Sequence, residues 1–175
     1  THTATVSPST SVNGCNGDTV ILTANTNAIS PFTYQWNINS AAISGATSST
    51  VAVTQSGYYS VTIIKNGCPV TSSAGQVTFN NHPQQPTITS AGAIVPCVGG
   101  AVTLTASSIS GVTYSWNTTP AQTTPSITVN SSGNYLVTVT NGAGCSATSA
   151  PFTVNASLSQ RPICMVTVDI ASARN

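Results

Sequence analysis

Charged side chains are almost missing from this sequence of 175 residues. It holds three Lys and Arg residues and two acids, Asp18 and Asp169, and it has no Glu. Glycoside hydrolysis needs a pair of carboxylates, and calcium sites need several carboxylate ligands, so neither kind of site is expected. The net charge of +1 gives no field that would attract nucleic acid or anionic lipid, and neither is an expected partner.

Other reactive groups are scarce as well. His2 and His82 are far apart in the sequence, so no Ser or Cys nucleophile is expected to have a His base beside it. The cysteines show no C-x2-C spacing, which argues against zinc. No run of about 18 apolar residues is present, so membrane insertion is not expected. We therefore predict a protein that is not an enzyme, with no catalytic residue, metal or cofactor.

Five cysteines occur in a chain that is rich in Thr, Ser, Asn and Gly. This combination indicates an oxidising compartment, and we expect an extracellular or cell-surface location. Apolar residues make up 39% of the chain, which is enough for packed cores. Disordered chains combine low hydrophobicity with high charge, and this one has neither.

The sequence contains two copies of one pattern. Four short motifs of the first copy recur in the same order about 80 residues later. The matching segments are Cys15–Ala24 with Cys97–Ala106, Thr33–Asn37 with Thr113–Asn117, Ser56–Ile63 with Ser132–Val139, and Asn66–Cys68 with Gly142–Cys145. This recurrence predicts a duplicated domain whose loops differ in length.

The repeat also predicts where the modules begin and end. We expect a first module at residues 1–80, a linker at 81–86 and a second module at 87–156. The two prolines of the linker favour an extended, semi-rigid connection. Residues 157–175 are expected to begin a further β-domain or to be a strand donated to a neighbouring subunit.

Each copy is predicted to consist of β-strands. Apolar residues alternate with threonine in Val102–Ala106 and Leu136–Thr140, as in half-buried strands. Turn residues divide the sequence about every 8 to 12 residues, and no amphipathic helix is evident. The pattern predicts an all-β fold of two tandem β-sandwiches.

Aromatic residues at matching positions indicate that the sandwiches are immunoglobulin-like. Trp36 and Trp116 are expected to fill the two cores, as the Trp of the third strand does in such domains; the alternative is an aromatic platform for sugar. Tyr59 and Tyr135 follow a Ser-Gly step and are predicted to form tyrosine corners, whose hydroxyl bonds to the backbone upstream. Two residues later both copies carry valine where an antibody domain carries cysteine, so the usual central disulfide is absent.

The cysteines are expected at the edges of the sandwiches instead. Cys15 and Cys97 precede the second strand of their copies, while Cys68 and Cys145 follow the sixth. Repeat symmetry favours Cys15–Cys68 and Cys97–Cys145, one disulfide in each copy, over the two pairings that join the copies. Each would contribute roughly 4 kcal/mol in the chain-entropy model. Cys164 is left over, as an unpaired thiol or with a partner outside this chain.

The ordered motifs resemble a known family. Cys-x-Gly, Val-x-Leu-Thr-Ala, Tyr-x-Trp, Ser-Gly-x-Tyr-x-Val-Thr and Gly-Cys together resemble the immunoglobulin-like repeat modules of large secreted surface proteins from type IX-secreting bacteria. The resemblance covers both copies and implies a spacer or an adhesive arm. Pro162–Asp169 resembles the opening strand of a further β-domain in those proteins. Asp18-Thr19-Val20 resembles their acceptor for O-linked glycans, so Thr19 is a predicted glycosylation site.

Three functions fit these features. The first is a structural or adhesive module of a secreted cell-surface protein, with neighbouring domains of the same protein as partners. The second is a subunit of an extracellular filament assembled through β-strand contacts, because few charges protect its strand edges. The third is a carbohydrate-binding module of a secreted enzyme, with surface polysaccharide as the partner and Phe32, Tyr34 and Tyr58 as the candidate residues.

Overall fold

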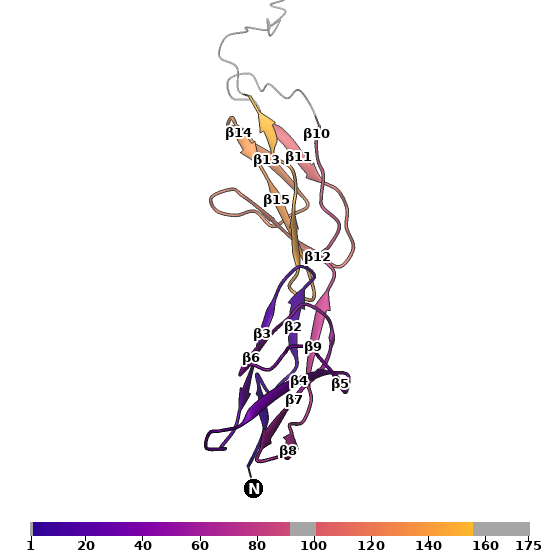
Figure 1. Ribbon diagram of the computed structural model, residues 1–175. Coiled ribbons are helices and arrows are strands. Elements are labelled where there is room, and N and C mark those ends of the chain that lie inside the picture. Colours follow the sequence, from indigo (N-terminus) through magenta and orange to yellow (C-terminus); the bar gives the residue numbers. More distant parts are fainter. Residues whose placement is uncertain (1, 92–100, 156–175) are drawn as a thin grey trace, which may run out of the picture. The chain divides into compact units, whose positions relative to one another are not determined.

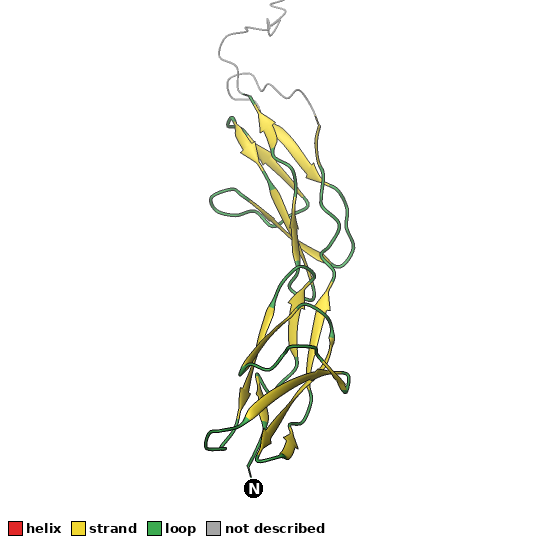
Figure 2. Cartoon of the chain, viewed as in Figure 1, coloured by secondary structure: helices red, strands yellow, loops and turns green. Residues whose placement is uncertain are grey.

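The computed structural model describes residues 2–91 and 101–155. Within these ranges every regular element is a β-strand (Figures 1 and 2). The predicted all-β class is therefore confirmed. The strands are rich in Val, Ile, Thr and Tyr, whose branched or aromatic side chains pack well on a pleated surface.

The described residues form two compact units. The first unit holds those up to Pro83 together with Thr140–Ser146, and the second holds those of Gln84–Val139 and from Ala147 onward. The first unit therefore includes a short segment that the sequence assigns to the second repeat. The module bounds expected from the repeat stay a prediction, and the segment 157–175 lies outside the described residues.

The first unit is a sandwich of two sheets. One has the strand order β1-β3-β6, and the other has the order β2-β9-β7-β4-β5, with β8 also paired to β7. Strand β2 runs parallel to β9, whereas β7 is antiparallel to β4, β8 and β9. The strands are β1 (Thr5–Ser7), β2 (Val12–Cys15), β3 (Val20–Asn25), β4 (Thr33–Ile38), β5 (Ala41–Ala42), β6 (Thr50–Val53), β7 (Gly57–Lys65), β8 (Cys68–Thr71) and β9 (Gly75–Asn80).

This strand order is that of an immunoglobulin-like sandwich. Immunoglobulin domains place their B and E strands in one sheet and their C, F and G strands in the other. Here β3 and β6 share the first sheet, while β4, β7 and the divided strand β8–β9 share the second. The chain order of the strands and their distribution over the two sheets both match.

The second unit repeats this arrangement with shorter strands. Its sheets have the orders β10-β11-β13 and β12-β15-β16, and β14 pairs with β17. The strands are β10 (Ile88–Ala91), β11 (Val102–Ala106), β12 (Val112–Trp116), β13 (Ser126–Val129), β14 (Gly133–Tyr135), β15 (Val137–Asn141), β16 (Ser146–Thr148) and β17 (Phe152–Val154). The parts of the second sheet correspond to β4, β7 and β8–β9 of the first unit.

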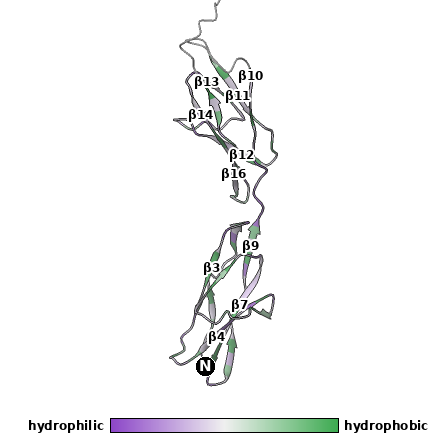
Figure 3. Ribbon diagram, turned by 45° about the horizontal axis from the view of Figure 1, so that its top comes forward, coloured by the Kyte–Doolittle hydropathy of each residue, from purple (hydrophilic) through white to green (hydrophobic). Residues whose placement is uncertain are grey.

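Each core is formed by every second residue of its strands, because successive side chains point to opposite faces of the sheet. Along β7, Tyr59, Val61 and Ile63 are buried, and the residues between them face outward. Hydrophobic and hydrophilic residues accordingly occur within the same strands in both units (Figure 3). The period of two places one face of each strand in the core and leaves a mostly Thr and Ser face to solvent.

Candidate functional site

A disulfide between Cys15 and Cys145 joins two segments that are 130 residues apart in the sequence. Cys15 ends β2, and Cys145 follows the turn after β15; their Cα atoms are 5.6 Å apart. The predicted pairs Cys15–Cys68 and Cys97–Cys145 are therefore wrong. Cys68 is free and exposed. Cys97 and Cys164 lie outside the described residues.

The fold explains why Cys15 does not bond to Cys68. Cys15 faces Asn80 in the β2–β9 pair, and β9 runs beside the beginning of β7, at Gly57. Cys68 pairs with Lys65, at the other end of β7. The strand rises about 26 Å between these ends at ~3.3 Å per residue. The Cα atoms of a disulfide are at most ~7 Å apart, so a bond across the first sandwich is impossible.

Polar contacts surround the disulfide within the first unit. Asp18 accepts a hydrogen bond from Cys15 N through Oδ2 at 2.9 Å, and Asp18 N donates to Cys15 O at 2.9 Å. Asn141 closes the other turn, because its Oδ1 accepts from Cys145 N at 3.0 Å. Its Nδ2 donates to Asn81 O at 2.9 Å. Both cysteine-bearing turns are thus held by side chains of their own.

His82 bridges the same two turns. Its Nδ1 lies 2.8 Å from Ser146 O and its Nε2 lies 3.0 Å from Asn16 O. Both partners are carbonyl oxygens, which only accept hydrogen bonds. A neutral imidazole donates from one nitrogen, whereas the imidazolium donates from both. The histidine that the sequence places in a linker is therefore part of the junction around the disulfide.

The two tryptophans lie in the two cores. Trp36 is 0% exposed and Trp116 is 1% exposed. The indole nitrogen of each donates to a carbonyl oxygen at 2.9 Å, that of Ser48 for Trp36 and that of Thr124 for Trp116. Burial of the indole with its one donor satisfied gives packing without an unpaired polar group. Neither ring is available as a platform for sugar.

Tyr59 and Tyr135 have the bonding pattern of tyrosine corners. The Tyr59 hydroxyl donates to Gln55 O at 2.8 Å, and the Tyr135 hydroxyl donates to Ser131 O at 2.9 Å. Tyr59 is buried, whereas Tyr135 is half-buried at the edge of its core. Burial raises the pKa of Tyr59 above its usual value, because the phenolate would lose its hydration.

The structure separates the candidate sugar-binding aromatics. Phe32 and Tyr34 pack edge to face, with ring centroids 5.3 Å apart, beside a groove of about 1020 Å³. Both also pack against the first core. Tyr58 is exposed and adjacent in β7 to the buried Tyr59, so it lies on the outer face of the sheet. The three rings do not form one row.

Ionisable groups are as sparse in the structure as in the sequence. Within residues 2–91 and 101–155, no three His, Cys, Asp or Glu side chains are grouped so that they could hold a metal ion. Asp18 is bonded within the cysteine turn, and the neighbouring Thr19 is exposed. No helix in this part of the chain is long and apolar enough to cross a membrane.

Two buried serines, which the sequence analysis did not identify, form hydrogen bonds inside the cores. Ser72 and Ser149 interrupt the last strand of their repeats. Their Oγ atoms accept from Val61 N and Val137 N at 3.1 Å, and their own backbone nitrogens donate back to the same two valines at 2.9 Å. The signal was present, because a Thr-Ser pair follows the cysteine at the same spacing in both copies.

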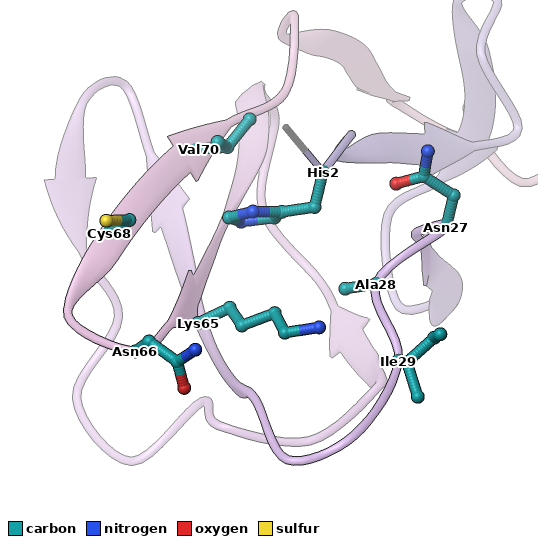
Figure 4. Close-up of a pocket in the computed structure, with 8 residues that line it drawn as sticks. All are labelled: His2, Asn27, Ala28, Ile29, Lys65, Asn66, Cys68 and Val70. Carbon is teal, nitrogen blue, oxygen red and sulfur yellow. The ribbon is translucent and has the colours of Figure 1, made fainter.

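A cavity of about 500 Å³ lies beside the free Cys68 (Figure 4). Its walls come from the N-terminal segment, the 27–29 loop and the β7–β8 hairpin. The ring of His2 lies between β8 and the loop, and its Nε2 is 3.1 Å from Ile63 O. The lining residues are His2, Asn27, Ala28, Ile29, Lys65, Asn66, Cys68 and Val70.

No protein-family model matches the chain, and no curated protein matches it in sequence. Among solved structures it is similar to an I-band fragment of titin, with 12% identity over 85% of this chain and 63% of that one, at a TM-score of 0.44. It is also similar to the first four immunoglobulin domains of Sidekick-1, with 11% identity over 88% and 48% of the two chains, at a TM-score of 0.39.

A third similar structure is a protein of the mixed-linkage glucan utilization locus of Bacteroides ovatus, in complex with a heptasaccharide. The identity is 12% over 82% of this chain and 42% of that one, at a TM-score of 0.36. The chain spans less than two thirds of the length of each of these three structures. The strand order described above, and not these similarities, is the basis of the immunoglobulin-like assignment.

Proposed function

We propose that this chain is a structural spacer or arm of a secreted cell-surface protein and that it carries tension. The observation that carries the proposal is the disulfide between Cys15 and Cys145, which joins the first repeat to the turn after β15 in the second. A structural disulfide persists in an oxidising compartment and supports an extracellular location. The resemblance of the repeat motifs to surface proteins of type IX-secreting bacteria supports the same origin.

The position of the disulfide determines how the chain carries tension. A force applied beyond the two cysteines passes from Cys15 directly to Cys145, because the covalent bond is the shortest path. Strands β3 to β15, and with them most of both cores, lie between these residues, and they are not extended once the strands outside the bond have been pulled away from them. When a core opens, the chain between Cys15 and Cys145 therefore adds nothing to the length of the spacer.

Single-molecule pulling of the full chain from its two ends tests this function. With the disulfide intact, the chain between the two cysteines, whose sequence separation is 130, contributes nothing to the final extension. After reduction the fully unfolded chain is expected to gain about 430–470 Å, at ~3.3–3.6 Å per residue. The Cys68→Ser variant is the control and is expected to behave like the parent chain. Equal extensions before and after reduction would contradict the proposal.

The other two functions have different support. Carbohydrate binding would use a row of exposed rings, and the separation of Tyr58 from Phe32 and Tyr34 argues against it. Assembly into a filament would use strand edges, which few charged side chains protect in this chain. Glycosylation of the exposed Thr19 remains our prediction, to be checked by mass spectrometry of the native protein.

A further inference from the structure

Lys65, the only lysine of the sequence, ends β7 on the face of the strand that points into the first sandwich. Successive side chains of a strand alternate between its two faces, and Tyr59, Val61 and Ile63 are buried on the inner one. Lys65 continues this row, so its half-buried side chain enters the cavity at the end of the sandwich. Figure 4 shows its ammonium group directed toward the 27–29 loop.

The second repeat uses the same position differently. Four residues after the buried valine of its sixth strand it has Asn141, where the first repeat has Lys65. Asn141 is neutral and closes its turn, because its Oδ1 accepts from Cys145 N at 3.0 Å. Lys65 has no hydrogen-bond or ion-pair partner within residues 2–91 and 101–155. The lysine is therefore not required to close the hairpin that it begins.

The first unit offers no counter-ion for this ammonium group. Its one acid is Asp18, which is bonded to Cys15 near the beginning of β7, while Lys65 is at the end of that strand. The two ends are about 26 Å apart at ~3.3 Å per residue. Salt screens exposed charges beyond about 8–10 Å. An external anion can therefore pair with Lys65 without competition from an acid of the first unit.

Neutral polar groups line the cavity beside the ammonium group. The side-chain amide of Asn66 has no partner among the described residues. Asn27 accepts from Thr3 N through Oδ1 at 2.8 Å, which leaves its Nδ2 free to donate. The Nε2 of His2 lies 3.1 Å from Ile63 O, so Nε2 donates and Nδ1 of the neutral ring is an acceptor. The cavity thus combines one positive charge with amide donors and an acceptor.

Apolar side chains complete the wall of the cavity. Ala28, Ile29 and Val70 lie around it, and Ile29 is 79% exposed (Figure 4). The volume of about 500 Å³ is within the range of sites for small molecules, roughly 300–1,000 Å³. The charge suits a carboxylate, the donors and the acceptor suit hydroxyl groups, and the aliphatic wall suits C–H groups. A sugar acid carries all three.

We propose that this cavity binds a sugar acid of the hexuronate class, whose carboxylate pairs with the ammonium group of Lys65. The ring hydroxyls bond to the two asparagine amides and to His2, and the C–H groups contact Ile29. One exposed ion pair and a few hydrogen bonds correspond to a millimolar dissociation constant for a single sugar. The site differs from the row of aromatic rings considered above, because charge and not stacking holds the ligand. The inference goes beyond the spacer function, which requires no ligand.

The test is a titration of the full chain with sodium glucuronate at neutral pH and constant ionic strength, followed by ¹H–¹⁵N NMR. We expect the amide signals of Ala28, Asn66 and Gly67 to shift. Glucose has a hydroxymethyl group in place of the carboxylate, and acetate has the carboxylate without the ring. Each should bind about tenfold more weakly or less.

A linear trimer of glucuronate residues distinguishes two sources of the same ligand. Tighter binding of the trimer than of the single sugar indicates an acidic polysaccharide, and weaker binding indicates a free sugar acid. Both results support the proposed site.

Two variants separate a local site from the net charge of the chain. Lys65→Gln should weaken glucuronate binding by about tenfold or more, because it removes the charge. An unchanged indole N–H signal of Trp36 shows that its core is intact. The double variant Lys65→Gln with Ala52→Lys restores the net charge on strand β6, where Ala52 is exposed, and should not restore binding.

Five results would each overturn the proposal: no shift of the cavity amides, equal binding of glucose, equal binding of acetate, unchanged binding by Lys65→Gln, or binding restored by Ala52→Lys. The pulling experiment contains no ligand and does not depend on Lys65. Failure of the sugar-acid site and failure of the spacer function can therefore be told apart.

Discussion

The two repeats build their sixth strand in different ways. In the first repeat β7 is unbroken over nine residues, whereas the second repeat divides the strand into β14 and β15 at Leu136. Asn117 fills the interruption: its Oδ1 accepts from Leu136 N at 2.8 Å, and its backbone nitrogen donates to Leu136 O at 3.1 Å. A side chain thus replaces a missing bond of the sheet.

Despite this difference, each core contains the same set of hydrogen bonds. Both have a Trp that donates to a carbonyl oxygen, a tyrosine corner, and a buried serine that bonds to the central valine of the sixth strand. The repeats differ at the outer turns, where the free and the bonded cysteines lie. The core determines the fold, and the ends determine what each repeat is connected to.

Separate replacement of Cys145 and Cys68 should give the largest difference in stability between the two repeats. In the chain-entropy model a disulfide that closes a loop of 130 residues contributes about 5 kcal/mol. Cys145→Ser should lower the free energy of unfolding by up to that amount. Cys68→Ser replaces an exposed free thiol and should change the free energy of unfolding by less than about 0.5 kcal/mol. Urea denaturation without reductant measures both. A similar loss in the two variants would contradict the assigned pairing.

The buried serines should show that the cores are equivalent. Ser72→Ala and Ser149→Ala remove the acceptor of a buried backbone N–H, so each should cost about 1–3 kcal/mol. Amide hydrogen exchange at Val61 and Val137 should accelerate in the variant of the same repeat only. If one substitution were neutral, the shared bonding pattern would not be equally important in both cores.

Substitutions in the tyrosine corners should give the smallest losses of stability, and the loss should be larger for Tyr59 than for Tyr135. Tyr59→Phe removes a buried hydrogen bond and should cost about 1 kcal/mol. Tyr135→Phe should cost less, because the site is half-buried and water can bond to Ser131 O in place of the lost hydroxyl in the folded variant. Chemical denaturation of each variant beside the parent chain measures these losses.

Alkaline pH gives a second test at Tyr59. Burial raises its pKa in the folded state, so the neutral form is favoured there and the unfolded chain ionises first. The stability from this residue is full below the unfolded-state pKa of about 10 and is lost as pH rises through the folded-state pKa. Tyr59→Phe should reduce the alkaline loss of stability, and an unchanged pH profile would exclude Tyr59 as its source.

The sequence allowed the sandwiches to be predicted and not the disulfide. Strand period, turn spacing and the repeated Trp and Tyr positions are local signals, and they are sufficient for an all-β, immunoglobulin-like fold. The partner of Cys15 depends on the parallel pairing of β2 with β9, which places Cys15 and Cys68 at opposite ends of β7. Repeat symmetry favoured a bond within each copy. That prediction failed because symmetry carries no information about which ends of the strands lie close together.

The bond between Cys15 and Cys145 also imposes an order on the maturation of the chain. Cys68 emerges during synthesis long before Cys145, and in an unfolded chain its shorter loop to Cys15 is favoured by roughly 0.8 kcal/mol. Folding of the first sandwich holds Cys15 and Cys68 apart and so removes the competing reaction. The pairing of Cys15 with Cys145 is therefore favoured when the first domain folds before Cys15 is oxidised.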